Sequence, residues 1–201
     1  MVRRLLAVAV CAVFAATAVP SHAATLKACP TFTDPKGDSF LTVESAKTPL
    51  ADPALDITSV KFKPVGKSLG MAITVAKYAA RPAYAYGNRY QVEFTLGGRL
   101  ITVYYKQSAT RAQEGKVFYQ AAMKDGTAVA SGDVQATVVG NTITMLVTNK
   151  VLNASLGSKA IGSKITGLHA YAYGSYVGYN LGWDSATAKS SLSYVLGSAC
   201  K

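Results

Sequence analysis

The sequence has little of several residue types, and each shortage excludes a class of site. It contains one tryptophan, three cysteines and two histidines. Zinc and copper sites need several thiolate or imidazole ligands, so neither is expected. Beyond the first 23 residues no apolar run is long enough to cross a bilayer. We therefore expect no membrane span in the remainder of the chain.

Acidic residues are also scarce, with 10 against 21 basic ones and a net charge of +11. Such a chain attracts extracellular polyanions, including acidic polysaccharides and anionic wall polymers. The bases are scattered singly, however, which is more typical of a solvated surface. No specific nucleic-acid partner is expected.

Residues 1–23 have the pattern of a secretory signal peptide. Two arginines precede an apolar run that is too short for a comfortable membrane span. The small residues Ser21 and Ala23 suit cleavage, and a retained anchor helix is the alternative. Cleavage would give a secreted, extracellular protein in which residues 24–201 form a single domain with enough chain for a core.

Loss of the signal would leave two cysteines, Cys29 and Cys200, at opposite ends of the domain. In an oxidising compartment we expect them to form one disulfide, with two unpaired thiols as the alternative. The closed loop would enclose nearly the whole domain and constrain the unfolded chain by about 5 kcal/mol. The pairing also predicts that the first and last strands are neighbours.

Alternation of apolar and polar residues with a period of two dominates the chain and predicts strands. Glycine-containing turns at 66–68, 97–98 and 140–141 separate pairs of such runs, which is typical of β-hairpins. The pattern predicts an all-β fold, an antiparallel β-sandwich of immunoglobulin-like or jelly-roll-like type with about eight or more strands. The predicted strands are 55–65, 69–77, 88–96, 99–107, 116–123, 133–139, 142–148, 164–174 and 192–197.

One stretch, residues 149–164, departs from this alternation. Val151, Leu152 and Leu156 have helical spacing, and Gly157 is suited to end a helix. We expect one short helix or turn there.

Five of the ten acidic residues fall between positions 34 and 56 of this basic chain. In the stretch DPKGD, Pro35 fixes its own φ and Gly37 allows a tight turn, so Asp34 and Asp38 can converge. Converging oxygen ligands suit Ca²⁺, which takes roughly six to eight of them. Asp-Pro-Lys-Gly is also a favourable type I turn that needs no metal, and the residues alone leave both interpretations open.

Four segments carry a resemblance to a known group of proteins: CPTFTDPKGD (29–38), DPALDITSVKF (52–62), LGMAITVA (69–76) and WDSATAKSSLSYVLGSAC (183–200). They resemble small secreted sandwich proteins of actinobacterial type, which are similar to family-nine carbohydrate-binding modules and DOMON-like domains. In that superfamily the Asp-Pro-x-Gly-Asp loop commonly binds calcium and stabilises the sandwich. The resemblance implies a structural Ca²⁺ site whose candidate ligands are Asp34, Asp38, Asp56 and Asp184, with Asp52 as a further candidate.

Tyrosines are concentrated in two segments, and their rings suit the apolar face of a sugar or a partner protein. The alternative is that they fill the sandwich, which we favour for Tyr171 and Tyr173 because they alternate along a strand. The carbohydrate-binding relatives hold sugar between paired tryptophans, so the single Trp183 argues against binding of that kind. The candidate ligand-binding residues are Tyr84, Tyr86, Tyr176, Tyr179 and Trp183.

Nothing in the chain indicates an enzyme. His169 is the only histidine after the signal, and no Gly-x-Ser-x-Gly motif supplies a nucleophile beside it. Some DOMON-like domains hold haem through one Met and one His, and Met71 and His169 would be the candidates. We expect a non-catalytic, calcium-stabilised sandwich that binds carbohydrate or a wall polymer. A structural or protein-interaction domain of the cell envelope is the alternative.

Overall fold

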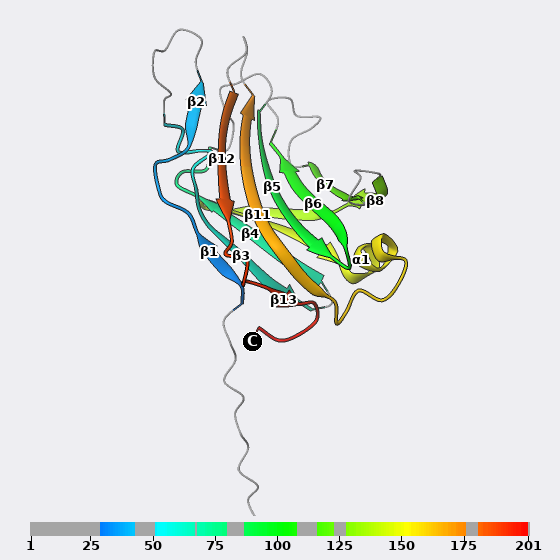
Figure 1. Cartoon of the computed structure of the whole chain (residues 1–201). Helices are drawn as coiled ribbons and strands as arrows, with labels where there is room; N and C mark the ends of the chain where they lie inside the picture. The colour runs from blue at the N-terminus through cyan, green and yellow to red at the C-terminus, as the bar shows by residue number, and fades with distance from the viewer. Residues whose placement is uncertain are drawn as a thin grey trace, which may run out of the picture.

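Antiparallel strands form two sheets in the structure, a computed structural model, and one short helix accompanies them (Figure 1). The predicted all-β sandwich is therefore confirmed. Within the described part of the chain, no helix has the length and apolar character needed to cross a membrane. The predicted signal peptide lies outside the described residues, which are 29–42, 51–66, 68–79, 87–107, 116–122, 128–175 and 181–200.

The smaller sheet has five strands in the order β1-β3-β4-β10-β9, and every pairing is antiparallel. Two of its hairpins are those predicted from glycine turns. Val65 pairs with Ser68 across the first, and Val139 pairs with Thr142 across the second. The strands are β1 (Thr31–Thr33), β3 (Ile57–Val65), β4 (Ser68–Val75), β9 (Gln135–Val139) and β10 (Thr142–Thr148).

The larger sheet has the order β2-β12-β11-β5-β6-β7-β8, with β13 beside β11. The long strands β11 and β5 lie side by side in its middle (Figure 1). Alternation does not predict β1, β2, β8 or β12, and β13 is shorter than the strand expected at 192–197. The strands are β2 (Phe40–Thr42), β5 (Gly87–Leu96), β6 (Arg99–Lys106), β7 (Lys116–Ala122), β8 (Ala128–Asp133), β11 (Lys164–Ser175), β12 (Leu181–Thr187) and β13 (Tyr194–Val195).

The hairpin between β5 and β6 turns at Gly97 and Gly98, as predicted. Leu96 pairs with Arg99 across it, and the two glycines have φ values of 57° and 78°, as a type I′ turn requires. A side chain at Gly97 would also crowd the helix, because its Cβ would lie 2.9 Å from Cδ2 of Leu156. Both the turn and the neighbouring helix therefore need glycine at this position.

The core lies between the two sheets. Tyr90, Val92, Phe94 and Leu96 of β5 are fully buried, as their alternation predicts. Phe62 of the smaller sheet meets Phe94 edge to face, with ring centroids 5.9 Å apart. Complete burial of one such side chain stabilises the fold by about 1.5–3 kcal/mol. The apolar faces of the strands thus hold the sheets together and leave the opposite faces of the strands for function.

The predicted short helix is α1 (Asn149–Leu156), and both of its ends follow from the sequence. Thr148 caps the N-terminus, where its Oγ1 accepts a hydrogen bond from the N–H of Val151 at 3.4 Å. Gly157 ends the helix in the left-handed conformation, with a φ of 66°. Leu152 is buried against the sandwich.

Cys29 and Cys200 form the predicted disulfide, with Cα atoms 4.5 Å apart. The further prediction that the first and last strands are neighbours is wrong. β1 pairs with β3 in the smaller sheet, whereas β13 pairs with β11 in the larger one. The cysteines lie just outside these strands, so the disulfide connects a segment next to one sheet with a segment next to the other.

Candidate functional site

The segment between β1 and β2 folds the DPKGD motif into a turn against the smaller sheet. The N–H of Asp34 donates to the carbonyl of Thr58 on β3 at 3.3 Å. Gly37 has a φ of 91°, and its N–H donates to Oδ2 of Asp56 at 2.9 Å. Asp56 therefore stabilises the middle of the turn. The side chains of Asp34 and Asp38, which belong to the turn itself, take no part in these two hydrogen bonds.

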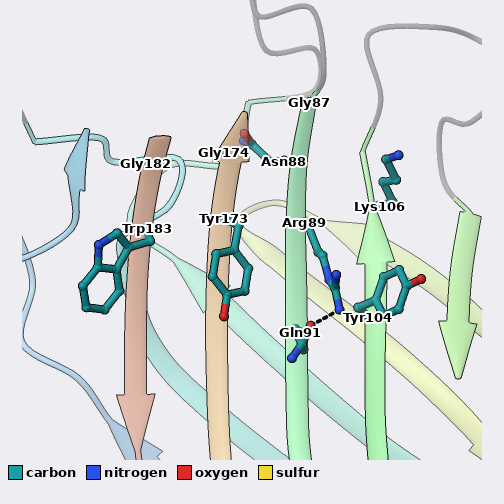
Figure 2. Close-up of a pocket in the computed structure, with 10 residues that line it drawn as sticks. All are labelled: Gly87, Asn88, Arg89, Gln91, Tyr104, Lys106, Tyr173, Gly174, Gly182 and Trp183. Carbon is teal, nitrogen blue, oxygen red and sulfur yellow. Dashed lines mark hydrogen bonds between the residues drawn. The ribbon is translucent and has the colours of Figure 1, made fainter. Parts of the chain in front are cut away.

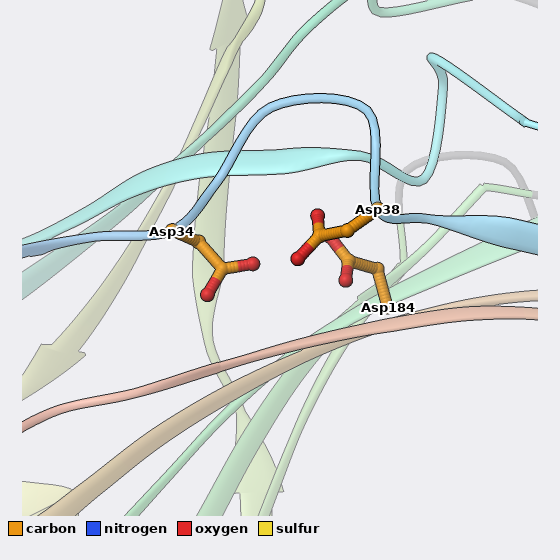
Figure 3. Close-up of side chains that lie close together, drawn as sticks. All are labelled: Asp34, Asp38 and Asp184. Atoms are coloured by element: carbon orange, nitrogen blue, oxygen red, sulfur yellow. The ribbon is translucent and has the colours of Figure 1, made fainter.

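Three carboxylates meet beside this turn. One oxygen from each of Asp34, Asp38 and Asp184 lies within 4.8 Å of the other two. Figure 3 shows the three side chains pointing toward one another. Two of them come from the turn and the third comes from β12 of the larger sheet, so the cluster joins the N-terminal segment to a strand near the C-terminus.

Asp184 is 4% exposed and is fixed by two backbone groups. Its Oδ2 accepts a hydrogen bond from the N–H of Ile57 at 2.6 Å, and its Oδ1 accepts one from the N–H of Ser185 at 2.8 Å. Each carboxylate oxygen has a second lone pair. The side chain is therefore held in place and still has capacity to bind a cation.

Burial and like charge both disfavour ionisation of Asp34, Asp56 and Asp184. Burial is the larger cause that raises the pKa of Asp34 from its ordinary 3.8 to about 6, and the neighbouring carboxylates raise it further, Asp184 first. Burial also raises the pKa of Asp56 and of Asp184, although backbone N–H groups that donate to each carboxylate act in the opposite direction. A nearby positive charge would relieve this cost.

Two carboxylate oxygens at this place are buried without a hydrogen bond among the residues described, Oδ2 of Asp34 and Oδ1 of Asp56. Asp56 is only 3% exposed. A buried acceptor without a partner costs about 1–3 kcal/mol. Bound Ca²⁺ accepts oxygen ligands in flexible geometry, so the donor set fits this ion.

Asp52, the weakest of the predicted ligands, has a different role. Its Oδ1 accepts a hydrogen bond from the N–H of Ala54 at 2.9 Å. Its carbonyl accepts from the N–H groups of Leu55 and Asp56. These bonds cap the turn that leads into β3. The structure thus brings three predicted ligands together, places Asp56 beside them through Gly37, and leaves Asp52 out of the cluster.

A second group of side chains forms a row on the outer face of the larger sheet (Figure 2). Trp183 on β12 lies opposite Tyr173 on β11, which lies opposite Arg89 on β5. Arg89 in turn lies opposite Lys106 on β6. Three steps of about 4.8 Å between strands make the row about 14 Å long. It borders an open pocket of about 880 Å³, which we call the outer-face pocket.

Trp183 and Tyr173 expose large apolar surfaces in this row, at 42% and 40% of their area. Trp183 is held by Phe40, whose ring it meets edge to face with centroids 4.7 Å apart. Tyr173 stacks on Tyr171, with centroids 5.9 Å apart. The row therefore offers fixed aromatic surfaces to a ligand.

The prediction that Tyr171 and Tyr173 fill the sandwich is wrong. Their strand turns Ala170 and Ala172 into the core instead, and both alanines are fully buried. Ala172 lies opposite Tyr90 on β5. The buried ring of Tyr90 needs the volume that a small neighbour leaves, so the large side chains of β11 lie on the outer face.

Arg89 is the cation at the centre of the row. Its guanidinium carbon lies 3.8 Å from the centroid of the Tyr104 ring. Its Nη2 donates a hydrogen bond to Oε1 of Gln91 (dashed line in Figure 2). Gln91 in turn donates from Nε2 to Oε1 of Glu93 at 2.5 Å. These contacts fix the guanidinium beside the pocket.

The structure describes only Trp183 among the five predicted ligand-binding aromatics. Tyr84, Tyr86, Tyr176 and Tyr179 lie outside the described residues. Sequence reasoning did not select Arg89, Tyr104 and Tyr173. Alternation along residues 88–96 already separates Arg89 from the core residues, but only the strand order brings it beside Tyr173.

The haem alternative does not fit the structure. Met71 on β4 is fully buried between the sheets. His169 lies on the outer face of β11, where its ring stacks on Tyr171 and its Nδ1 lies 3.2 Å from Oγ1 of Thr187. The larger sheet separates the two side chains, so they cannot bind one iron from opposite sides.

No protein-family model matches the chain, and no curated protein is significantly similar to it. The resemblance to carbohydrate-binding and DOMON-like sandwiches therefore stays a prediction. A functional proposal therefore has to rest on the chemistry of the acidic cluster and of the outer-face pocket.

Proposed function

We propose that this protein is an exported, non-catalytic β-sandwich that binds carbohydrate on the outer face of its larger sheet and is stabilised by calcium. The observation that carries the proposal is the row of exposed Trp183, exposed Tyr173 and fixed Arg89 beside an open pocket. Aromatic rings pack on the apolar faces of sugars, and neighbouring polar groups bind the hydroxyls.

Calcium is proposed for the cluster of Asp34, Asp38 and Asp184. Its support is the convergence of three carboxylates and the two buried oxygens nearby that accept no hydrogen bond in the described structure. The ion would neutralise charge that burial alone makes unfavourable. In this proposal calcium stabilises the sandwich and takes no part in a reaction, and the disulfide and the predicted signal peptide support export.

A panel of soluble polysaccharides and a glycan array test the carbohydrate proposal. We expect retention of at least one glycan, with affinity about tenfold lower in Trp183→Ala because a stacking surface is lost. Thr187→Ala is the matched control, since it changes the same face of β12 further from the pocket. Failure of the wild-type protein to bind any glycan would contradict the proposal and favour the protein-interaction alternative.

A further inference from the structure

The outer-face pocket is positively charged as well as aromatic. Two of its lining residues, Arg89 and Lys106, are cations, and none of those that the structure describes is a carboxylate. Without Arg3 and Arg4 of the predicted signal peptide the net charge of +11 becomes +9, so the field around the pocket of the mature protein also favours anions. We propose that the pocket selects an acidic polysaccharide whose sugars carry carboxylates, and that Arg89 binds the carboxylate. This inference rests on the proposed carbohydrate function and specifies its ligand class.

The guanidinium of Arg89 is already held in position in the absence of a ligand. Stacking on Tyr104 and the hydrogen bond to Gln91 hold the guanidinium plane in one orientation. A long side chain normally loses rotamer freedom when it binds, and prior fixation reduces that cost. Gln91, which is 5% exposed, is itself held by Glu93. The sheet therefore positions Arg89 through two further residues of the same strand.

The charge of Arg89 has no direct counter-ion in the described part of the chain. Glu93 reaches it only through the amide of Gln91, and no described carboxylate forms an ion pair with it. Its Nε–H is buried and likewise has no hydrogen-bond partner among the described residues. Arginine binds carboxylates through two parallel N–H···O bonds, which makes it more selective than a point charge. An incoming carboxylate would supply the guanidinium charge with the counter-ion that the described structure leaves out.

The spacing of the row suits a sugar acid better than a small anion. Tyr173 lies on the strand next to Arg89, about 5 Å away across the sheet. In a uronic acid the carboxylate is attached directly to the sugar ring. A ring packed on Tyr173 would therefore place its carboxylate over Arg89, and Trp183 on the next strand could take a neighbouring sugar. A neutral sugar would gain the stacking but would leave Arg89 without its partner.

The deciding comparison is between oligogalacturonides and their fully methyl-esterified forms of the same length. We expect the full-length mature protein, titrated calorimetrically with calcium held constant, to bind the acidic form at least about tenfold more tightly. Equal affinity for the two forms would overturn the inference and leave the carbohydrate proposal standing. Binding to neither form nor to any other glycan would remove both. Tighter binding of a sulfated or phosphorylated polymer of equal charge would overturn the assignment to carboxylates.

Substitutions at Arg89 test the assigned residue. Arg89→Gln should abolish the preference for the acidic form, while Arg89→Lys should retain part of it because it keeps the charge but loses the paired N–H groups. Lys61→Gln is the charge-matched control, since Lys61 is exposed on the smaller sheet. An equal loss in Lys61→Gln would mean that only net charge matters, which would overturn the inference. Circular dichroism and melting temperature establish that each variant is folded.

Discussion

Trp183 and Asp184 are neighbours on β12, yet they belong to regions of opposite chemistry. Trp183 is 42% exposed on the outer face, beside aromatic rings and cations. Asp184 is 4% exposed and points to the acidic turn (Figures 2 and 3). Successive side chains of a strand point to opposite faces, so one strand serves both regions.

The difference between the two regions lies in how each charge is compensated. In the acidic cluster Asp184 is buried and Asp34 is half-buried, and neighbouring carboxylates raise the cost of their negative charge. On the outer face Arg89 lies beside an open pocket, where water can solvate exposed charge until a ligand arrives. A buried charge is costly unless it is paired within the folded protein, whereas water solvates a charge at the surface before any ligand binds. We therefore expect the cluster to govern stability and the outer face to govern recognition.

The largest effect is expected for Asp184→Ala. The substitution removes the acceptor of two backbone N–H groups and a proposed calcium ligand, so the free energy of unfolding in calcium should fall by about 3–5 kcal/mol. The adjacent Trp183→Ala should cost only about 1 kcal/mol, because that ring is partly exposed. Urea denaturation monitored by circular dichroism measures both. Equal losses at the two positions would remove the distinction between stability and recognition.

Chelation is expected to have the next largest effect. At calcium concentrations about a hundredfold above its dissociation constant, bound ion stabilises a protein by about 3 kcal/mol. EDTA should therefore lower the melting temperature by roughly 5–10 °C, and added calcium should restore it. Asp38→Ala should abolish this response because it removes one of the three proposed carboxylate ligands.

Glu93→Gln is the control for the chelation experiment. It removes one negative charge from the outer face of the larger sheet, and Glu93 is not part of the acidic cluster. The variant should respond to EDTA as the wild-type protein does. If EDTA left the melting temperature of the wild-type protein unchanged, the DPKGD motif would be a turn that needs no ion.

Much of the fold was predictable because the decisive information is local. Gly97-Gly98 and Gly140-Asn141 specify turns that fix the register of their hairpins. Helical spacing followed by Gly157 predicts α1 and its end. In both cases a few adjacent residues determine the backbone, so the chain on its own contains the signal.

β12 could not be predicted in the same way. Gly182, Asp184 and Ser185 are poor strand formers, and pairing with β11 and β2 makes the segment a strand. The convergence of Asp184 with the N-terminal turn depends on that pairing. The spacing of residues near Asp34 therefore indicated two ligands, and only the resemblance suggested the third.

Alternation also fails to say which face of a strand is the core. It correctly separates the alanines of β11 from Tyr171 and Tyr173, but it does not tell which of the two sets faces the core, and the tyrosines were assigned there. The buried Tyr90 opposite Ala172 decides the matter, and that contact joins strands far apart in the sequence. Sequence reasoning therefore missed the outer-face pocket, because it assigned Tyr171 and Tyr173 to the core face of β11.

The smallest effect is a pH dependence that separates the two regions in the metal-free protein. Burial and neighbouring carboxylates raise the pKa of Asp34 to about 6, against 3.8 for an unperturbed group. Between about pH 4 and about pH 6 the folded state therefore holds a proton that the unfolded state has released, so this group makes stability fall as the pH rises.

Urea midpoints measured in EDTA should show that contribution as a difference between the wild-type protein and Asp34→Asn, which cannot titrate. Arg89→Gln should leave the pH dependence unchanged, because none of the described residues that line its pocket is a carboxylate. A difference of the opposite sign would mean that the folded protein already stabilises the ionised form of Asp34, and the cluster would then need no cation.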